Sequence, residues 1–407
     1  MRLVIQRALA GAMAVVCLLA GQALADDGQR AADETNLNDV QLLGKRIFED
    51  ASLSEPRGMA CMSCHDPRHA FQGGNNSSIP GVALGSRADR IGARKVPTLM
   101  YKSFAPPFKF YKDTDDGKIV LEPKGGQFWD GRADDLAGQV KGPLVNPDEM
   151  NNPSLDAAVD KIAGGEYASL AKRALGEDLF EDKAAAMDKL AGAVAAYEET
   201  DRFKPFSSKF DDWLRGKAQL TALEKRGYRI FIDPKRGNCT ACHAGTTDSK
   251  YPDDWLFTDF TYVDAGLPRN PALPANADPK TYDLGLCASP TLAAKLPEGK
   301  KREDYCGQFK TPTLRNIAVA KSFFHNAVFT SLRDAVAFYA TRDTDPAHWY
   351  RASGEARPFN DQPVAYLANI DREVPYDRKI GQKPRLDNGD IDALVAFLKT
   401  LTDKGME

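Results

Sequence analysis

The sequence contains two pentapeptides, Cys61-Met62-Ser63-Cys64-His65 and Cys239-Thr240-Ala241-Cys242-His243, that share the pattern Cys-x-x-Cys-His. This pattern is typical of c-type haem attachment, in which both thiols add to the haem vinyl groups and the adjacent histidine binds the iron. A redox-active dithiol does not require the histidine, and a zinc site needs further ligands. We therefore expect two covalently bound c-type haems, with His65 and His243 as iron ligands.

The two motifs lie in an internal repeat. Gly44-Lys45-Arg46-Ile47-Phe48 precedes the first motif and Gly227-Tyr228-Arg229-Ile230-Phe231 precedes the second, each in a stretch with helical apolar spacing. Another helical pattern closes each half, with apolar positions at Met187, Leu190, Val194 and Tyr197 and at Ile391, Leu394, Val395, Phe397, Leu398 and Leu401. We therefore expect an all-α fold of two cytochrome c-like haem domains with long ordered loops.

The chain of 407 residues is long enough for two ordinary domains. Stretches rich in proline and glycine, such as Ala105-Pro106-Pro107 and residues 266–279, indicate long loops. We place the boundary between the halves near Lys204 to Lys209. The expected organisation is a signal peptide at 1–25, an N-terminal domain at 26–205 with the peroxidatic haem, and a C-terminal domain at 206–407 with the electron-transfer haem.

The first residues have the pattern of an export signal. Arg2 and Arg7 precede an apolar run, and Ala23-Leu24-Ala25 forms a small-x-small cleavage site. A membrane anchor is the alternative, but the apolar run is too short to cross a bilayer comfortably. We therefore expect the signal peptide to be removed and the mature chain to lie in the periplasm without a membrane span.

Charge and composition say little about partners. A formal net charge of -3 provides no basic surface for nucleic acid. Two cysteines lie outside the haem motifs and the signal peptide, Cys287 and Cys306. In an oxidising compartment we expect them to form a disulfide that closes a surface loop and stabilises the fold by about 3 kcal/mol.

The sixth ligand of the first iron decides whether that haem can activate peroxide. The only spare histidine before the second motif is His69, which follows His65 by four residues and lies on the same side of the haem ring. We therefore expect the first iron to be five-coordinate or water-bound. The alternative is that a methionine, Met100 or Met150, binds it.

The second iron has a different set of candidate ligands. After Met187 the sequence contains one methionine, Met406, near the C-terminus. This scarcity argues against the histidine–methionine ligation that is usual in electron carriers. The candidates left open are His325, His348 and an unusual oxygen ligand.

Further motifs make the sequence similar to the bacterial dihaem cytochrome c peroxidase and MauG family, over essentially the whole mature chain. The resemblance rests on the two haem motifs and on Gln127-Phe128-Trp129-Asp130-Gly131-Arg132-Ala133, Gln139, Gly142-Pro143-Leu144-Val145-Asn146-Pro147-Asp148-Glu149-Met150, Phe309-Lys310-Thr311-Pro312-Thr313-Leu314-Arg315-Asn316 and Phe323-Phe324-His325.

The resemblance implies roles for individual residues. Trp129 resembles the tryptophan that relays electrons between the two haems. Glu149 resembles the acid-base residue beside the open iron, and a carboxylate suits the proton transfers of peroxide cleavage. Gln139 resembles the polar neighbour that helps to order this acid-base residue. Tyr339 lies where the family's peroxidases have a methionine ligand. A tyrosine at this position resembles the MauG branch, and a phenolate ligand stabilises oxidised iron.

The resemblance also implies a function. We expect a periplasmic peroxidase that reduces hydrogen peroxide at the His65 haem with electrons relayed through the His243 haem from a small electron-donor protein. One alternative is a MauG-like enzyme that uses a peroxide-derived high-valent dihaem state to oxidise side chains of a partner protein. A second is a plain dihaem electron carrier. The oligomeric state is open, and a homodimer is one option.

Three departures from the family pattern modify these expectations. No histidine follows the first motif at the position of the displaceable ligand, so activation by reduction is not expected. Lys95 replaces the asparagine that commonly binds calcium before Val96-Pro97-Thr98-Leu99, so calcium is uncertain and the lysine ammonium is a candidate substitute for the ion. Arg236-Gly237-Asn238 occupies the position of MauG's surface tryptophan, so the MauG substrate route is not supported.

Overall fold

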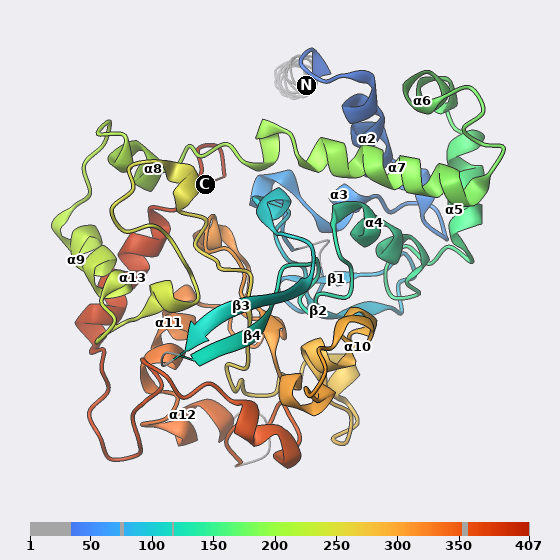
Figure 1. The fold of residues 1–407 in the computed structure, drawn as a ribbon. Helices are drawn as coiled ribbons and strands as arrows, with labels where there is room; N and C mark the ends of the chain where they lie inside the picture. Colours follow the sequence, from blue (N-terminus) through green and yellow to red (C-terminus); the bar gives the residue numbers. More distant parts are fainter. Residues whose placement is uncertain (1–33, 74–76, 116–117, 352–356, 407) are drawn as a thin grey trace, which may run out of the picture.

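The structure is a computed structural model that describes residues 34–73, 77–115, 118–351 and 357–406. The predicted signal peptide, 1–25, lies outside the described residues. The described chain forms two groups of helices side by side, with short strands between and below them (Figure 1). Within these ranges, no helix combines the length and the apolar character that crossing a bilayer requires.

The helices fall into two sets along the chain. The first set is α2 (Asp39–Glu49), α3 (Cys61–Cys64), α4 (Leu136–Val145), α5 (Leu155–Ala163), α6 (Ala168–Leu175) and α7 (Lys183–Glu198). The second set is α8 (Lys209–Leu214), α9 (Ala222–Ile232), α10 (Pro290–Lys295), α11 (Leu332–Thr341), α12 (Pro346–Tyr350) and α13 (Asn388–Lys399).

Each half brings its first long helix against its last. α2 packs against α7, and α9 packs against α13. At both crossings a glycine meets a backbone: a Cβ atom on Gly44 would lie 1.9 Å from the carbonyl oxygen of Ala193, and one on Gly227 would lie 1.9 Å from that of Ala393. Because no side chain fits there, the repeated glycine sets the same close helix crossing in both halves.

An aromatic core surrounds each crossing. In the first half Phe48 packs edge-on against Tyr197 and Phe203, with ring centroids 5.7 and 6.3 Å apart. In the second half Phe397 makes the corresponding contacts with Phe210 and Phe231, at 5.6 and 5.3 Å. The buried apolar residues of the first core come from between Leu43 and Phe203, and those of the second core come from between Phe210 and Leu401.

The expectation of an all-α fold needs correction, because the mostly helical chain also contains three two-stranded antiparallel sheets. The strand pairs are β1 (Val82–Leu84) with β2 (Ile91–Lys95), β3 (Lys109–Asp115) with β4 (Lys118–Lys124), and β5 (Tyr262–Val263) with β6 (Phe309–Lys310). The longest pair, β3–β4, runs in register from Lys109–Lys124 to Asp115–Lys118. Aromatic and β-branched residues on both sides of the sequence pair Asp116-Gly117 favour a hairpin.

Buried polar contacts join the two halves. The Tyr101 hydroxyl donates a 2.7 Å hydrogen bond to the Asp403 carboxylate near the C-terminus. Arg315, fully buried, pairs with the equally buried Asp211 at 2.9 Å, and its guanidinium lies 4.8 Å from the centre of the Tyr101 ring. The Tyr101–Asp403 hydrogen bond and the Arg315–Tyr101 contact cross between the halves, whereas the buried Arg315–Asp211 pair lies within the second half and holds Arg315 in place for that contact.

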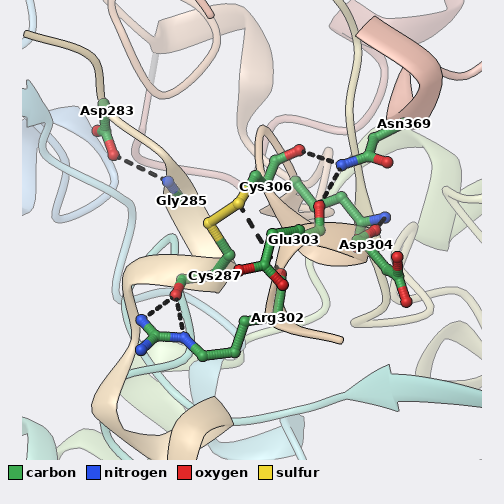
Figure 2. The surroundings of a disulfide bond; sticks show 9 residues. Asp283, Gly285, Cys287, Arg302, Glu303, Asp304, Cys306 and Asn369 are labelled. Carbon is green, nitrogen blue, oxygen red and sulfur yellow. Dashed lines mark hydrogen bonds between the residues drawn. A yellow bond between two sulfur atoms is a disulfide. The ribbon is translucent and has the colours of Figure 1, made fainter. Parts of the chain in front are cut away.

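A disulfide joins Cys287 to Cys306, the pairing expected from the sequence. Figure 2 shows how neighbouring side chains hold both ends of its loop. Arg302 Nε donates a 3.0 Å hydrogen bond to the carbonyl oxygen of Cys287, and Asn369 Nδ2 donates a 2.9 Å bond to that of Cys306. The two half-cystines belong to a small core that includes Phe108, at the start of the β3–β4 hairpin, so the bridge supports a strand pair as well as a loop.

Candidate haem sites

The first cysteine–histidine motif borders a cavity of ≈ 470 Å³. Cys61 and Cys64 are the first and last residues of the single-turn helix α3, and His65 caps it. The Nδ1 atom of His65 lies 2.9 Å from the carbonyl oxygen of Phe71, so Nδ1–H donates and the Nε2 lone pair is left for a metal. Burial lowers the pKa of His65 to about 4, which keeps the ring neutral, as iron ligation requires.

The second motif borders a separate cavity of ≈ 210 Å³. His243 repeats the arrangement: its Nδ1 atom lies 3.1 Å from the carbonyl oxygen of Pro312 and 3.2 Å from that of Phe257. Burial lowers the pKa of His243 to about 4. Both histidines are therefore fixed in the orientation and the neutral form of metal-binding imidazoles.

The donor sets of both cavities fit a c-type haem. Cys61, Cys64, Cys239 and Cys242 form no disulfide, so their sulfur atoms remain for thioether bonds. Burial raises the pKa of the Cys61 and Cys239 thiols to about 12, and the cavity walls are mainly apolar, as a porphyrin face requires. Each cavity thus combines two thiols, one oriented imidazole and an apolar wall.

The first cavity also contains the predicted acid-base pair. Glu149 and Gln139 line it together with His65. Glu149 Oε1 accepts a 3.0 Å hydrogen bond from Asn146 Nδ2. Burial raises the pKa of Glu149 above its ordinary value, and the nearby Arg132 and the Asn146 hydrogen bond act in the opposite direction. A carboxyl whose pKa is raised in this way can both accept and return a proton.

Helix α4 positions these groups. Gln139 and Pro143 are one turn apart on α4, and both line the cavity. Pro143 has no N–H, so it leaves the carbonyl of Gln139 without its helical hydrogen bond. After the helix ends, the amide of Glu149 donates to the carbonyl of Asn146 at 3.0 Å, and this turn directs the carboxyl back toward α4.

Trp129 lines both cavities. Its indole Nε1–H donates a 2.8 Å hydrogen bond to the carbonyl oxygen of Lys95. Its own carbonyl accepts a 2.8 Å bond from the amide of Lys310. Trp129, predicted as a relay, therefore borders both cavities, with its indole held by one hydrogen bond and its backbone by another.

The candidates for the second iron's sixth ligand separate in the structure. Tyr339 on α11 and His325 line the second cavity. His348 lies on the exposed side of α12, where its ring packs against Trp349 at 4.5 Å, and it is not among the described residues that line the cavity. The choice therefore narrows to Tyr339 and His325.

His325 already has close neighbours inside the protein. Its ring stacks on Phe309 with centroids 3.3 Å apart, and its buried Nε2 atom lies 3.8 Å from the Asp361 carboxylate. Burial lowers the pKa of His325 to about 3. Tyr339 stacks between Phe324 and Tyr376, at 5.6 and 5.4 Å, and burial raises the pKa of its phenol.

The candidate ligands of the first iron also differ in whether they line its cavity. His69 Nδ1 contacts the Asp66 carboxylate at 3.1 Å, and His69 is not among the described residues that line the cavity. Met100 is fully buried in the first core. Met150 lines the cavity, so it remains the alternative ligand.

Sequence reasoning missed several buried residues in the two cavities. Glu198 and Lys102 line the first cavity, and Lys310 and Tyr376 line the second. Glu198 follows Val194 by one helical turn, so the sequence places this acidic residue on the apolar face of the closing helix. An acidic residue on an apolar face is a signal of a buried carboxyl. Lys310 lies inside the Phe309–Asn316 motif, but the motif alone does not reveal its burial.

Two haem-type donor sets in a mostly helical chain, with an indole common to both cavities, define a dihaem c-type cytochrome. Comparisons with known proteins agree. A family model described as di-haem cytochrome c peroxidase matches residues 38–219. The methylamine utilization protein MauG of Paracoccus denitrificans is 35% identical over 384 residues, which are 93% of this chain and 91% of that protein.

Two further relatives extend the likeness. The cytochrome c551 peroxidase of Pseudomonas aeruginosa is 28% identical over 298 residues, 72% of this chain and 70% of that protein. The crystal structure of the diheme peroxidase BthA from Burkholderia thailandensis is 42% identical, covers 90% of this chain and 86% of that chain, and superposes with a TM-score of 0.83. The chain belongs to the dihaem cytochrome c peroxidase and MauG family, which implies two c-type haems, and it is an oxidoreductase.

Proposed function

We propose that this protein reduces hydrogen peroxide at a haem attached to Cys61 and Cys64, with electrons arriving through a haem attached to Cys239 and Cys242. The observation that carries the proposal is that Glu149, a partly buried carboxyl, lines the same cavity as His65. The haem at His65 supplies the iron that binds peroxide and the electrons that reduce it.

The protein's own groups handle protons and position. Glu149 takes the proton from one peroxide oxygen and returns it to the other, which leaves as water. Gln139, one helix turn from Pro143, orders the peroxide beside that carboxyl. Trp129 connects the two haem sites, because its indole lines both cavities.

Tyr339 is our proposed sixth ligand for the His243 iron. It lines the cavity that holds His243, whereas His348 faces away from it, and His325 already stacks on Phe309. A phenolate ligand favours oxidised iron and lowers the reduction potential. The second haem would then hold an oxidising equivalent until an electron from the donor protein reduces it.

Steady-state turnover tests the proposal. The holoprotein, mixed with hydrogen peroxide and a reduced small c-type cytochrome, should oxidise the cytochrome continuously, with two cytochromes oxidised per peroxide because peroxide reduction to water takes two electrons. A holoprotein with a wholly low-spin ferric spectrum and no reaction with peroxide would instead be an electron carrier.

A MauG-like activity on a partner protein is the second candidate. Tyr339 favours it, since a tyrosine in this position resembles the MauG branch. Arg236-Gly237-Asn238 argues against the MauG substrate route, because Arg236 there pairs with Asp390 and no tryptophan is present in that stretch. Peroxide-dependent modification of a periplasmic protein, without turnover of reduced cytochrome c, would select this candidate.

Export and domain organisation complete the proposal. We propose that residues 1–25 are removed on export to the periplasm and that residues 26–205 and 206–407 are the two haem domains, supported by the separate cores around the two helix crossings. Mass spectrometry of the periplasmic protein should give a chain that begins at Asp26 and carries two haems. Partners are peroxide and a small electron-donor protein or a protein substrate, and size-exclusion chromatography with light scattering would determine whether a homodimer forms.

We also propose that Lys95 takes the place of a calcium ion between the halves. Its Nζ atom donates to Gln72 Oε1 at 3.0 Å and to the carbonyl oxygen of Val96 at 3.2 Å, two acceptors of the kind that calcium binds. Elemental analysis should find two irons and no stoichiometric calcium. Calcium at one equivalent would contradict this substitution.

A further inference from the structure

Three buried lysines line the two cavities that Trp129 borders. Lys95, Lys102 and Lys310, here called the lysine cluster, are 6%, 9% and 3% exposed. Lys95 and Lys102 line the first cavity, and Lys310 lines the second. Two of them bond Trp129 through their backbones, so the cluster lies where the two cavities approach one another.

The cluster has no paired carboxylate within the part of the chain that the structure describes. Lys95 Nζ donates to an amide and a carbonyl oxygen, and Lys310 Nζ donates to the carbonyl oxygen of Gly126. Burial lowers the pKa of Lys95 to about 7 and that of Lys102 to about 8, and the charge on Lys102 lowers the pKa of both other lysines. Asp130 raises the pKa of Lys310 but forms its ion pairs with Arg94 and Arg132 instead.

Other buried cations in this protein are paired. Arg342 contacts Asp343 at 2.6 Å, and Arg315 contacts Asp211 at 2.9 Å. Three buried ammonium groups without such partners would be costly, since each loses its hydration without gaining a counter-charge. The contrast indicates that the lysine cluster's counter-charges come from outside the polypeptide.

Glu198 does not supply the missing charge. It raises the pKa of Lys102 from within the first cavity but forms no ion pair with it, and its buried Oε2 atom has no hydrogen-bond partner in the structure. Burial raises the pKa of Glu198 itself to about 8, so its ionised form is disfavoured. A stronger acid is needed to balance Lys102.

We infer that the lysine cluster is an anion site for the haem propionates, with Lys95 and Lys102 at the first haem and Lys310 at the second. This inference rests on the proposed haem attachment at the two motifs. Each haem carries two propionates, which provide the carboxylates that the cluster lacks. The cations also act on the irons: positive charge near a haem favours the ferrous form over the ferric form, so each lysine raises the potential of the haem nearest to it.

Redox titration of the holoprotein tests the inference. Lys102→Met should lower the reduction equilibrium constant of the first haem by about tenfold, a shift of about 59 mV for one electron, and leave the second haem nearly unchanged. Lys310→Met should do the converse. Lys102→Arg and Lys310→Arg keep the charge and should stay near wild type, and Lys217→Met removes an exposed charge as the matched control.

The outcomes separate this inference from the proposed function. Potentials that move no more in Lys102→Met and Lys310→Met than in Lys217→Met would overturn the propionate site, as would arginine variants that shift as far as the methionine variants. Thermal unfolding of the same holoproteins gives a second readout: loss of a paired cation lowers the midpoint, whereas a raised midpoint means that the lysine had no counter-charge. A wild-type protein with fewer than two haems by pyridine haemochrome would refute the attachment proposal instead. If Lys310→Met does not accumulate, the two Lys102 variants alone decide.

Discussion

The indole Nε1–H of Trp129 donates to the backbone carbonyl of Lys95 at 2.8 Å, so the ring between the two cavities is held by main chain rather than by a side chain. A carbonyl is a weak proton acceptor, so this hydrogen bond orients the indole without taking its proton. The amide of Lys310 fixes the other end of the residue. Substitutions of surrounding side chains should therefore leave the ring in place.

Trp129→Phe tests the relay directly. Phenylalanine keeps an aromatic ring but removes the hydrogen bond to Lys95, which costs about 1 kcal/mol of stability. We expect both haems to be attached and the first haem to react with peroxide, while electron transfer from the second haem becomes much slower. Stopped-flow absorbance of the two haem bands measures this; unchanged transfer would remove Trp129 from the route.

Glu149→Gln should slow the reaction with peroxide by about 100-fold or more, because the amide cannot carry the proton. Glu177→Gln, on the surface, is the matched control and should react at the wild-type rate. Burial raises the pKa of Glu149, and the reaction begins with the ionised form. The wild-type rate should therefore fall as the pH drops through this raised pKa, and the acid limb should vanish in Glu149→Gln.

Tyr339→Phe should change the absorption and electron paramagnetic resonance spectra of the second haem and leave those of the first unchanged. The physical reason is loss of an oxygen ligand from one iron only. His348→Gln removes the candidate ligand that lies outside the cavity, on the exposed side of α12, and should leave both spectra as in wild type. The reverse result would assign His348 as the ligand.

Met150→Leu distinguishes an open or water-bound first iron from one that is bound by Met150. Met150 lines the cavity, so a thioether bond to iron is its alternative role. With an open or water-bound iron, the ferric spectrum of this variant should match that of the wild type, because leucine conserves the packing volume. A change from low-spin to high-spin iron would show that Met150 is a ligand.

Gly44→Ala should destabilise the first half by roughly 1–3 kcal/mol, since its Cβ would overlap the carbonyl of Ala193. Gly192→Ala on the partner helix α7 is the control. A Cβ atom there meets nothing within 4 Å, so alanine should stabilise the helix by up to about 1 kcal/mol. Chemical denaturation monitored by circular dichroism measures both; equal stability of the two variants would contradict a backbone contact.

Motif and periodicity predict the parts of this protein that repeat. Gly44 and Gly227 mark equivalent helices because each is followed by a cysteine motif at similar spacing. The motif spacing also predicts the local geometry of His65, since that geometry is set within one helical turn. Sequence alone could not reveal the buried lysine cluster, because the burial of Lys95 and Lys310 depends on strands that meet only in the folded chain.

The β3–β4 hairpin shows the other limit. The Asp116-Gly117 pair and the residues that flank it favour a hairpin, but the stronger helical periodicity around the haem motifs predicts an all-α fold. For the second iron, the sequence left His325, His348 and an oxygen ligand open, and the family resemblance favoured Tyr339. Only the packing of α12 against its neighbours, with His348 turned outward onto Trp349, separates His348 from the other candidates.

At the glycine crossings, the first long helix of each half packs directly against the last helix of the same half. A protease that cuts an exposed loop of the second half, for example after Lys250, would leave α9 and α13 on different fragments. These fragments would still be packed backbone to backbone at Gly227 and Ala393. The nicked protein should therefore remain one particle and separate only when it is denatured, so that cleavage alone would not release either end of the domain.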